Sequence, residues 1–106
     1  MKERRNHPRF EIELPVTFHA NQQQIPAACV DISLGGICLL TEYTQEIPTK
    51  EVELKIGLPS YFYDITLRGK IIRKQKGIGQ RVAVEFLPEP SKGFQYLKSF
   101  LENRTK

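Results

Sequence analysis

The chain of 106 residues has no tryptophan, one methionine and only two residues each of cysteine and histidine. It has no run of 18 apolar residues, so we expect no membrane-spanning helix and no membrane insertion. The first nine residues lack the apolar stretch of a secretory signal. These absences predict a protein that stays in the cytoplasm.

The few candidate metal ligands and catalytic groups form no recognisable pattern. His7 and His19 do not have a ligand spacing, so we predict no metal site. Cys29 and Cys38 are compatible with a disulfide between neighbouring strands, but in a cytosolic chain we expect both to be reduced and to be small, buried apolar residues. No nucleophile with a neighbouring base is recognisable in the sequence. We therefore predict that the chain is not an enzyme and uses no cofactor.

A chain of this length is expected to form one domain, and its apolar residues mostly alternate with polar ones, which is typical of β-strands. Polar residues 21–24 are expected to form the first turn, and residues 74–79 a loop before the last strand. Gly69 and the consecutive pair Ile71 and Ile72 predict a bulge in the fifth strand. The predicted strands are six in number, at residues 11–18, 27–32, 37–41, 51–58, 65–72 and 82–86.

The end of the sequence changes to the periodicity of an amphipathic helix. We expect Ser91 to be its N-cap and Gly93 to weaken its first turn. The apolar positions that share one face of this helix are Phe94, Leu97, Phe100 and Leu101. The predicted fold class is therefore mostly β: a six-stranded antiparallel barrel over residues 11–106 with a C-terminal α-helix.

Basic residues are concentrated in two stretches. The first stretch has one acidic residue, Glu3, and contains Lys2, Arg4, Arg5 and Arg9. The second has no acidic residue between Asp64 and Glu85 and contains Arg68, Lys70, Arg73, Lys74, Lys76 and Arg81. Such clusters fit an anionic partner, which is a nucleotide, a nucleic acid or a membrane surface, but they also fit ordinary solvated strand faces. We predict that residues 1–10 form a flexible basic segment that binds the ligand.

Two arginines in this segment have a spacing suited to a phosphorylated ligand. Extended, Arg5 and Arg9 stand about 13 Å apart, at roughly 3.3 Å per residue. Pro8 disfavours a helix at the preceding residues, so the segment is expected to be extended or to turn. A guanidinium binds phosphate or guanine through two parallel hydrogen bonds and stacks on flat rings.

The second motif is the sequence Asp-Ile-Ser-Leu-Gly-Gly at residues 31–36. Strand alternation predicts that Asp31 and Ser33 point to one face and that Ile32 points into the core. A carboxylate there accepts hydrogen bonds from the N1–H and N2–H groups of guanine. Gly36 is expected to turn the chain through a positive φ or a close backbone approach. A plain serine turn followed by glycines explains the same residues.

Together, Arg5-xxx-Arg9 and Asp31-x-Ser33-xx-Gly36 resemble the motifs of the PilZ domain family of cyclic di-GMP receptors. The resemblance extends to the strand at residues 82–86, where Ala83 replaces a glycine that is frequent in relatives. It implies a bacterial cytoplasmic receptor in which Arg5 and Arg9 bind guanine and phosphate. It further implies that Asp31 and Ser33 contact base and phosphate and that Gly36 shapes the turn.

The resemblance also implies how the ligand binds. Arg4, immediately before the motif, goes with an intercalated pair of cyclic di-GMP molecules in such domains, so we expect two ligands per chain. We expect the dinucleotide to order the arginine segment, which carries the signal to an unidentified downstream protein. The alternative is a small-barrel nucleic-acid-binding protein that uses the second basic stretch and the aromatic residues 61–63, although the arginine motif makes nucleic acid the weaker choice.

Overall fold

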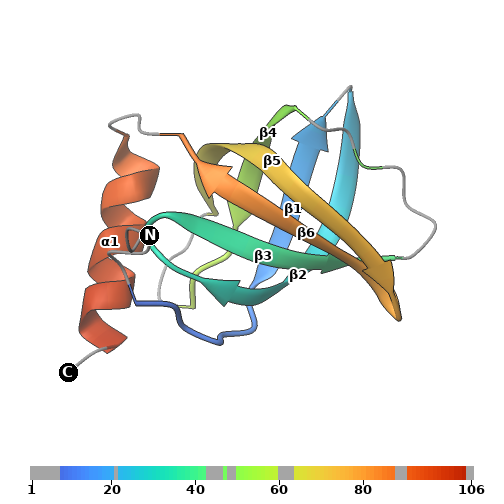
Figure 1. The fold of residues 1–106 in the computed structure, drawn as a ribbon. Helices are drawn as coiled ribbons and strands as arrows, with labels where there is room; N and C mark the ends of the chain where they lie inside the picture. Colours follow the sequence, from blue (N-terminus) through green and yellow to red (C-terminus); the bar gives the residue numbers. More distant parts are fainter. Residues whose placement is uncertain are drawn as a thin grey trace, which may run out of the picture.

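In the computed structural model of the chain, six strands close into an antiparallel barrel with one helix at an end of it (Figure 1). The structure describes residues 8–20, 22–42, 47, 50–59, 64–87 and 91–104. The strands are β1 (Pro15–Ala20), β2 (Gln23–Ile32), β3 (Gly36–Thr41), β4 (Glu51–Ile56), β5 (Ile65–Gly77) and β6 (Gly79–Phe86), and the helix is α1 (Lys92–Arg104). Their order around the barrel is β1-β2-β3-β6-β5-β4, and β4 pairs with β1 to close it. The predicted fold class is confirmed.

Alternation along the strands builds the core inside this barrel. Most inward positions of the strands carry aliphatic or aromatic side chains, and their neighbours point outward. Thr41 and Gln80 are buried polar exceptions. The most deeply buried side chains are Phe18, Ile25, Ile32, Ile37, Leu39, Leu54, Ile56, Val82 and Leu97. The core thus follows the period-two pattern of the sequence.

The first strand begins later than predicted. Residues 11–14 keep the alternating burial of a strand, but β1 starts only at Pro15. Phe10 is bridged to Ile32, whereas Pro15 is opposite Ala28, so the pairing shifts by one residue between these two points. The residues between them therefore form no continuous ladder.

Two predicted connections are also partly strand. β2 begins at Gln23 because Ala20 pairs with Gln23, and Gln22 in this turn has a φ of 65°. At the other connection, Lys74 to Gly77 pair with β6, which leaves a turn at Ile78. Both segments have few buried side chains, so their composition resembles that of loops although the backbone ladder continues. The bulge predicted in β5 is confirmed by the register shift between Ile71 and Arg73.

Helix α1 packs its apolar face on the barrel near the start of β5. Leu97, Phe100 and Leu101 are its buried residues. The Ser91 hydroxyl accepts a hydrogen bond from the Phe94 amide at 3.1 Å, as expected of an N-cap. A side chain at Gly93 would clash with the backbone of Thr66, so the glycine permits close packing of helix and strand. The described helix is too short and too polar to cross a membrane.

Candidate functional site

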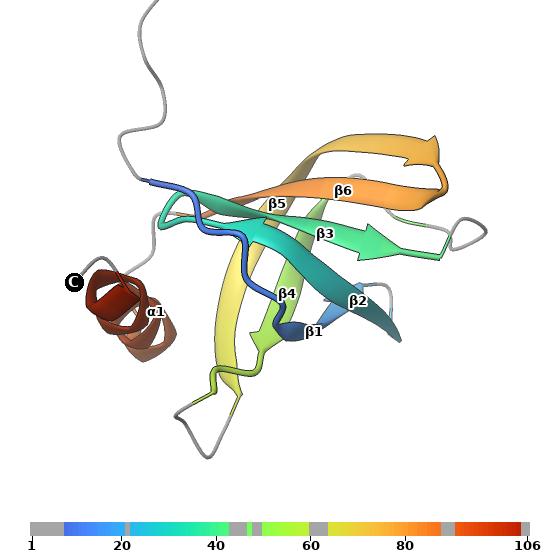
Figure 2. The same ribbon diagram turned by 90° about the horizontal axis from the view of Figure 1, so that it is seen from below.

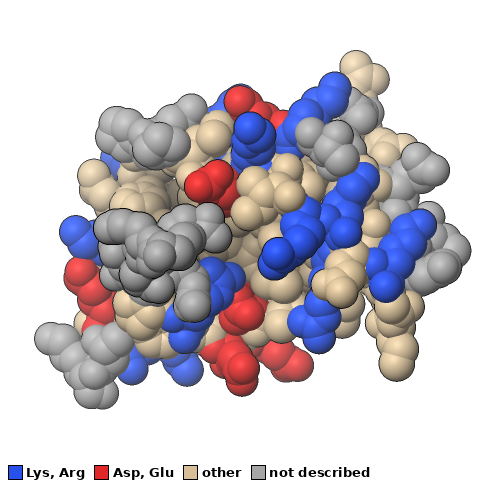
Figure 3. All heavy atoms as spheres, in the orientation of Figure 1, with Lys and Arg blue, Asp and Glu red and all other residues tan. Residues whose placement is uncertain are grey.

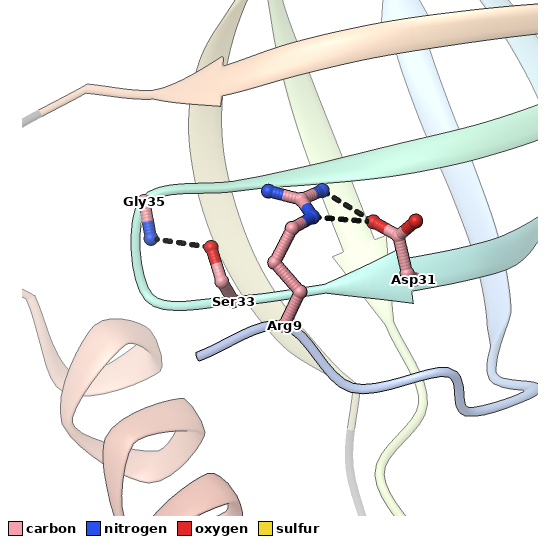
Figure 4. A network of polar contacts seen from close by, with 4 residues as sticks. All are labelled: Arg9, Asp31, Ser33 and Gly35. Carbon is pink, nitrogen blue, oxygen red and sulfur yellow. Dashed lines mark hydrogen bonds and ion pairs between the residues drawn. The ribbon is translucent and has the colours of Figure 1, made fainter. Parts of the chain in front are cut away.

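The turn between β2 and β3 is held by backbone and hydroxyl hydrogen bonds. The Ser33 amide donates to the Gly36 carbonyl at 2.9 Å, and the Ser33 hydroxyl accepts from the Gly35 amide at 3.0 Å (Figure 4). The Phe86 amide donates to the Gly35 carbonyl at 3.0 Å and ties the turn to β6. Ser33 is buried, with 2% of its surface exposed. Its hydroxyl thus already serves the turn.

Gly36 follows this turn because β6 approaches it closely. A Cβ atom at this position would clash with the carbonyl oxygen of Val84. Among the described glycines a positive φ is found at Gly79 and not at Gly36. Of the two reasons expected for a glycine here, close backbone approach is the correct one.

Arg9 and Asp31 bring the two sequence motifs together (Figure 4). The Arg9 Nε donates to Asp31 Oδ1 at 2.9 Å, and Nη2 donates to the same oxygen. The two side chains come from positions 22 residues apart, on the N-terminal segment and on β2. The Arg9 guanidinium lies over the outer face of the barrel, between Asp31 and the Ser33 turn (Figure 4).

The ion pair is partly open to solvent, with 30% of the Arg9 side chain and 27% of the Asp31 side chain exposed. Both hydrogen bonds end on Oδ1. A carboxylate accepts on both oxygens, and a guanidinium has five N–H donors. The pair therefore keeps acceptor and donor capacity for a polar ligand that reaches this face.

Phe10 positions Arg9, and the sequence reasoning did not identify this role. Its amide donates to the Ile32 carbonyl at 2.8 Å and its carbonyl accepts from the Ile32 amide at 2.9 Å. These bonds fix the backbone beside Arg9 against the end of β2. The signal for it was present, because Phe10 continues the apolar alternation of Ile12 and Leu14.

The two cysteines lie on opposite sides of the barrel wall, and both are free. Cys29 faces the core, where burial, together with the negative charge of Asp31, raises the pKa of its thiol to about 12. Cys38 is half-buried and lies opposite Asp31 in the β2–β3 register. The expectation of a small buried apolar residue therefore fits Cys29, whereas Cys38 belongs to the outer face beside Asp31.

Several predicted residues lie outside the described residues. Arg4 and Arg5 are in residues 1–7, and the aromatic stretch 61–63 is likewise not described. Of the predicted site residues, the structure thus brings together Arg9 and Asp31, beside the turn made by Ser33 and Gly36. The described part of the chain contains no group of three or more His, Cys, Asp or Glu side chains arranged to hold a metal ion.

In a comparison with protein families, residues 3–103 match the family described as PilZ domain. No curated protein matches the sequence.

Solved structures with this fold include proteins of three bacteria. The chain is similar to the Bacillus subtilis inhibitor of motility MotI (DgrA), with a TM-score of 0.80 and 20% identity over 98% of this chain and 52% of that one. It is similar to the PilZ domain of Escherichia coli YcgR with c-di-GMP, with a TM-score of 0.70 and 16% identity over 91% and 87% of the two chains. For the K. pneumonia MrkH–c-di-GMP complex the TM-score is 0.71, with 18% identity over 99% and 57%. The chain thus spans only about half of the length of MotI and MrkH.

Proposed function

The chain belongs to the PilZ domain family, and we propose that it is a non-catalytic receptor that binds cyclic di-GMP in the bacterial cytoplasm. The observation that carries this proposal is the contact of Arg9 with Asp31, which joins the arginine motif to the motif of the β2–β3 turn. A domain that binds this dinucleotide needs groups for phosphate and for guanine, and these two side chains supply both kinds.

The proposed ligand contacts follow from the chemistry of these groups. Arg9 and Arg5 bind phosphate and stack on guanine, and the Asp31 carboxylate accepts hydrogen bonds from the N1–H and N2–H groups of the base. Gly36 supports these groups by letting β6 approach the turn closely. Because its hydroxyl is used by the Gly35 amide, Ser33 contributes chiefly by holding the turn in shape, and it contacts the ligand only with its remaining hydrogen-bonding capacity.

A calorimetric titration tests the proposal directly. The chain is titrated with cyclic di-GMP, and GTP and cyclic GMP serve as controls of similar chemistry. We expect saturable binding of cyclic di-GMP and much weaker heats for the two controls. Equal binding of all three nucleotides, or of none, contradicts the proposal. Recovery of unchanged dinucleotide after incubation tests the non-catalytic part.

The number of bound ligands forms a second part of the proposal. Two stacked dinucleotides bring four negative charges and four guanines, so a third guanidinium at Arg4 offsets repulsion and extends the stack. We propose two ligands per chain, and one in an Arg4→Leu variant that still binds. A titration endpoint of one ligand for the unchanged chain contradicts this part and leaves the receptor assignment standing.

The signal that we propose is an ordering of the arginine segment around the ligand, which a downstream protein reads. Like charges in this segment repel one another, and the dinucleotide supplies the counter-charge. Amide hydrogen exchange with and without ligand tests this step. We expect protection of residues 4–9 to increase on binding, and equal protection in both states contradicts the proposed signal.

A further inference from the structure

The second basic stretch lies on the hairpin of β5 and β6. The proposed ligand site at Arg9 and Asp31 gives these basic residues no role. Residues 65–84 contain six basic and no acidic residues, whereas the rest of the chain contains ten basic and twelve acidic ones. The tip of this hairpin points away from α1 (Figure 2). On the same side of the molecule Figure 3 shows Lys and Arg side chains without Asp or Glu among them.

The basic residues in the two halves of this hairpin differ in the charge of their cross-strand neighbours. Near α1, Arg68 donates to Glu51 at 2.9 Å, and Lys70 lies opposite Glu51 on one side and Glu85 on the other. Opposite charges across strands stabilise one another in this way. The basic residues of this half are thus matched by the sheet itself.

Toward the tip, the cross-strand partners are neutral. Arg73 lies opposite Ala83, and Arg81 lies opposite Gln75 and Leu40. The exposed cations of this half are Arg73, Lys74, Lys76 and Arg81. The Lys74 ammonium donates a hydrogen bond to the Ile47 carbonyl at 2.7 Å. After the bulge, Arg73 and Arg81 share the outer face of the hairpin, whereas Lys74 and Lys76 share the opposite face. Positive charge therefore surrounds the tip on both faces.

The tip itself carries one apolar side chain. Ile78 is fully exposed, and glycines flank it on both sides. Because both neighbours are glycines, neither has a side chain that covers the isoleucine. Hairpin turns favour Asn, Asp and Gly, so a β-branched apolar residue at this point contributes nothing to the turn.

We propose that the tip of the β5–β6 hairpin docks on an anionic lipid surface, with Ile78 entering the headgroup layer and Arg73 and Arg81 meeting lipid phosphates. Apolar groups at the centre of a ring of Lys and Arg match the layering of such a surface. Residues 65–84 contain no aromatic residue for base stacking, which disfavours single-stranded nucleic acid. Cations on both faces of the hairpin also fit a surface that is met tip first better than one flat protein face. The proposal does not depend on cyclic di-GMP binding.

Vesicle co-sedimentation of the full chain tests this proposal. The vesicles consist of phosphatidylcholine alone, or of phosphatidylcholine with about one third phosphatidylglycerol. We expect the chain to sediment with the anionic vesicles only, and less so at high salt. The double substitution Arg73→Glu with Arg81→Glu should lower the partition coefficient by about 30-fold or more. A charge-matched control, Lys92→Glu with Lys98→Glu on the exposed side of α1, should lower it far less.

Substitutions of the tip separate lipid insertion from general charge attraction. Because only part of the side chain enters the headgroup layer, Ile78→Ser should weaken partition about fivefold to tenfold, and Ile78→Leu should retain it within about twofold. Unchanged melting temperatures establish that these exposed substitutions leave the fold intact. Failure to bind anionic vesicles overturns the proposal. Equal losses from the hairpin and α1 charge pairs, or no effect of Ile78→Ser, also overturn it and point instead to an acidic protein or nucleic acid as the partner.

Discussion

The Arg9–Asp31 site and the β5–β6 hairpin tip both carry arginine, but their charges are organised differently. At the site, the guanidinium is held by a carboxylate on β2, beside a turn whose hydroxyl and amides are already hydrogen-bonded. At the tip, the sheet register places neutral residues opposite Arg73 and Arg81. Fixed partners in the first region fit the proposed binding of a small ligand of defined shape, whereas the second region offers charge without a fixed shape, which fits the proposed extended surface.

The largest expected effect separates the two regions by ligand affinity. Arg9→Ala removes a charge-assisted contact worth about 1.5–3 kcal/mol, so cyclic di-GMP should bind roughly 10- to 150-fold more weakly or not detectably. Arg81→Ala on the hairpin is the matched control and should change the affinity less than about twofold, because screening at the surface leaves only a weak long-range effect. Calorimetry measures both. Equal losses would mean that the whole basic surface captures the ligand without a defined site.

Glycines give the second test, because Gly36 lies in a tight contact and Gly77 does not. Gly36→Ala forces a Cβ atom against the Val84 carbonyl, and such overpacking costs about 1–3 kcal/mol. The melting temperature should fall by roughly 4–20 °C for a domain of this size. Gly77→Ala meets nothing within 4 Å and should leave the melting temperature unchanged or slightly higher. A similar fall in both variants would contradict the close approach at Gly36.

The two thiols provide a third test, because Cys29 faces the core of the barrel and Cys38 lies on its outer face beside Asp31. At pH 8 a thiol reagent should label Cys38, whereas Cys29 should react only after unfolding, because burial raises its pKa to about 12. A raised pKa means that the folded state holds this proton more tightly, so its contribution to stability is complete below about pH 9. That contribution declines as the pH rises toward about 12. Melting curves at several alkaline pH values should show a smaller decline in Cys29→Val than in Cys38→Val. The same slope in both variants would contradict the assignment.

The smallest expected effect compares the two ion pairs. Arg68 and Glu51 have side chains that are 52% and 54% exposed, and pairs of this kind contribute about 0.2–1 kcal/mol. Glu51→Gln should therefore lower the free energy of unfolding by less than about 1 kcal/mol. Asp31→Asn, at the less exposed pair, should lower it more. Urea unfolding measures both, and the reverse order would contradict the view that Asp31 anchors the N-terminal segment.

The alternation of apolar and polar residues predicted where the strands lie, but it did not predict how the strands pair. The six strands, the bulge after Ile71 and the Ser91 cap followed from local patterns. The start of β1 and the length of the β5–β6 hairpin did not follow, because they depend on which residue lies opposite which. A one-residue shift between Phe10 and Pro15 is invisible in a chain that still alternates. Likewise, Lys74–Gly77 has the composition of a loop but the hydrogen bonding of a strand.

The sequence predicted the residues of the site but not the contacts between them. The motifs predicted Arg9, Asp31, Ser33 and Gly36 as site residues. Strand alternation correctly predicted that Ile32 points into the core. Their sequence spacing could not tell that Arg9 reaches Asp31 across 22 residues, or that the Ser33 hydroxyl is used by its own turn. Nor could it tell that Gly36 is required by the approach of Val84.

The sequence by itself determined which strand positions face the core, where the helix lies, and which charged groups the chain can offer. These properties depend on local periodicity and on the conformational preferences of individual residues. Only the tertiary structure decided which charges meet, because the register of strand pairing and the docking of the N-terminal segment on β2 set which residues lie opposite one another. The bridge of Phe10 to β2 brings Arg9 to its carboxylate. Strand pairing gives Arg68 and Lys70 their glutamates and leaves neutral cross-strand neighbours for Arg73 and Arg81.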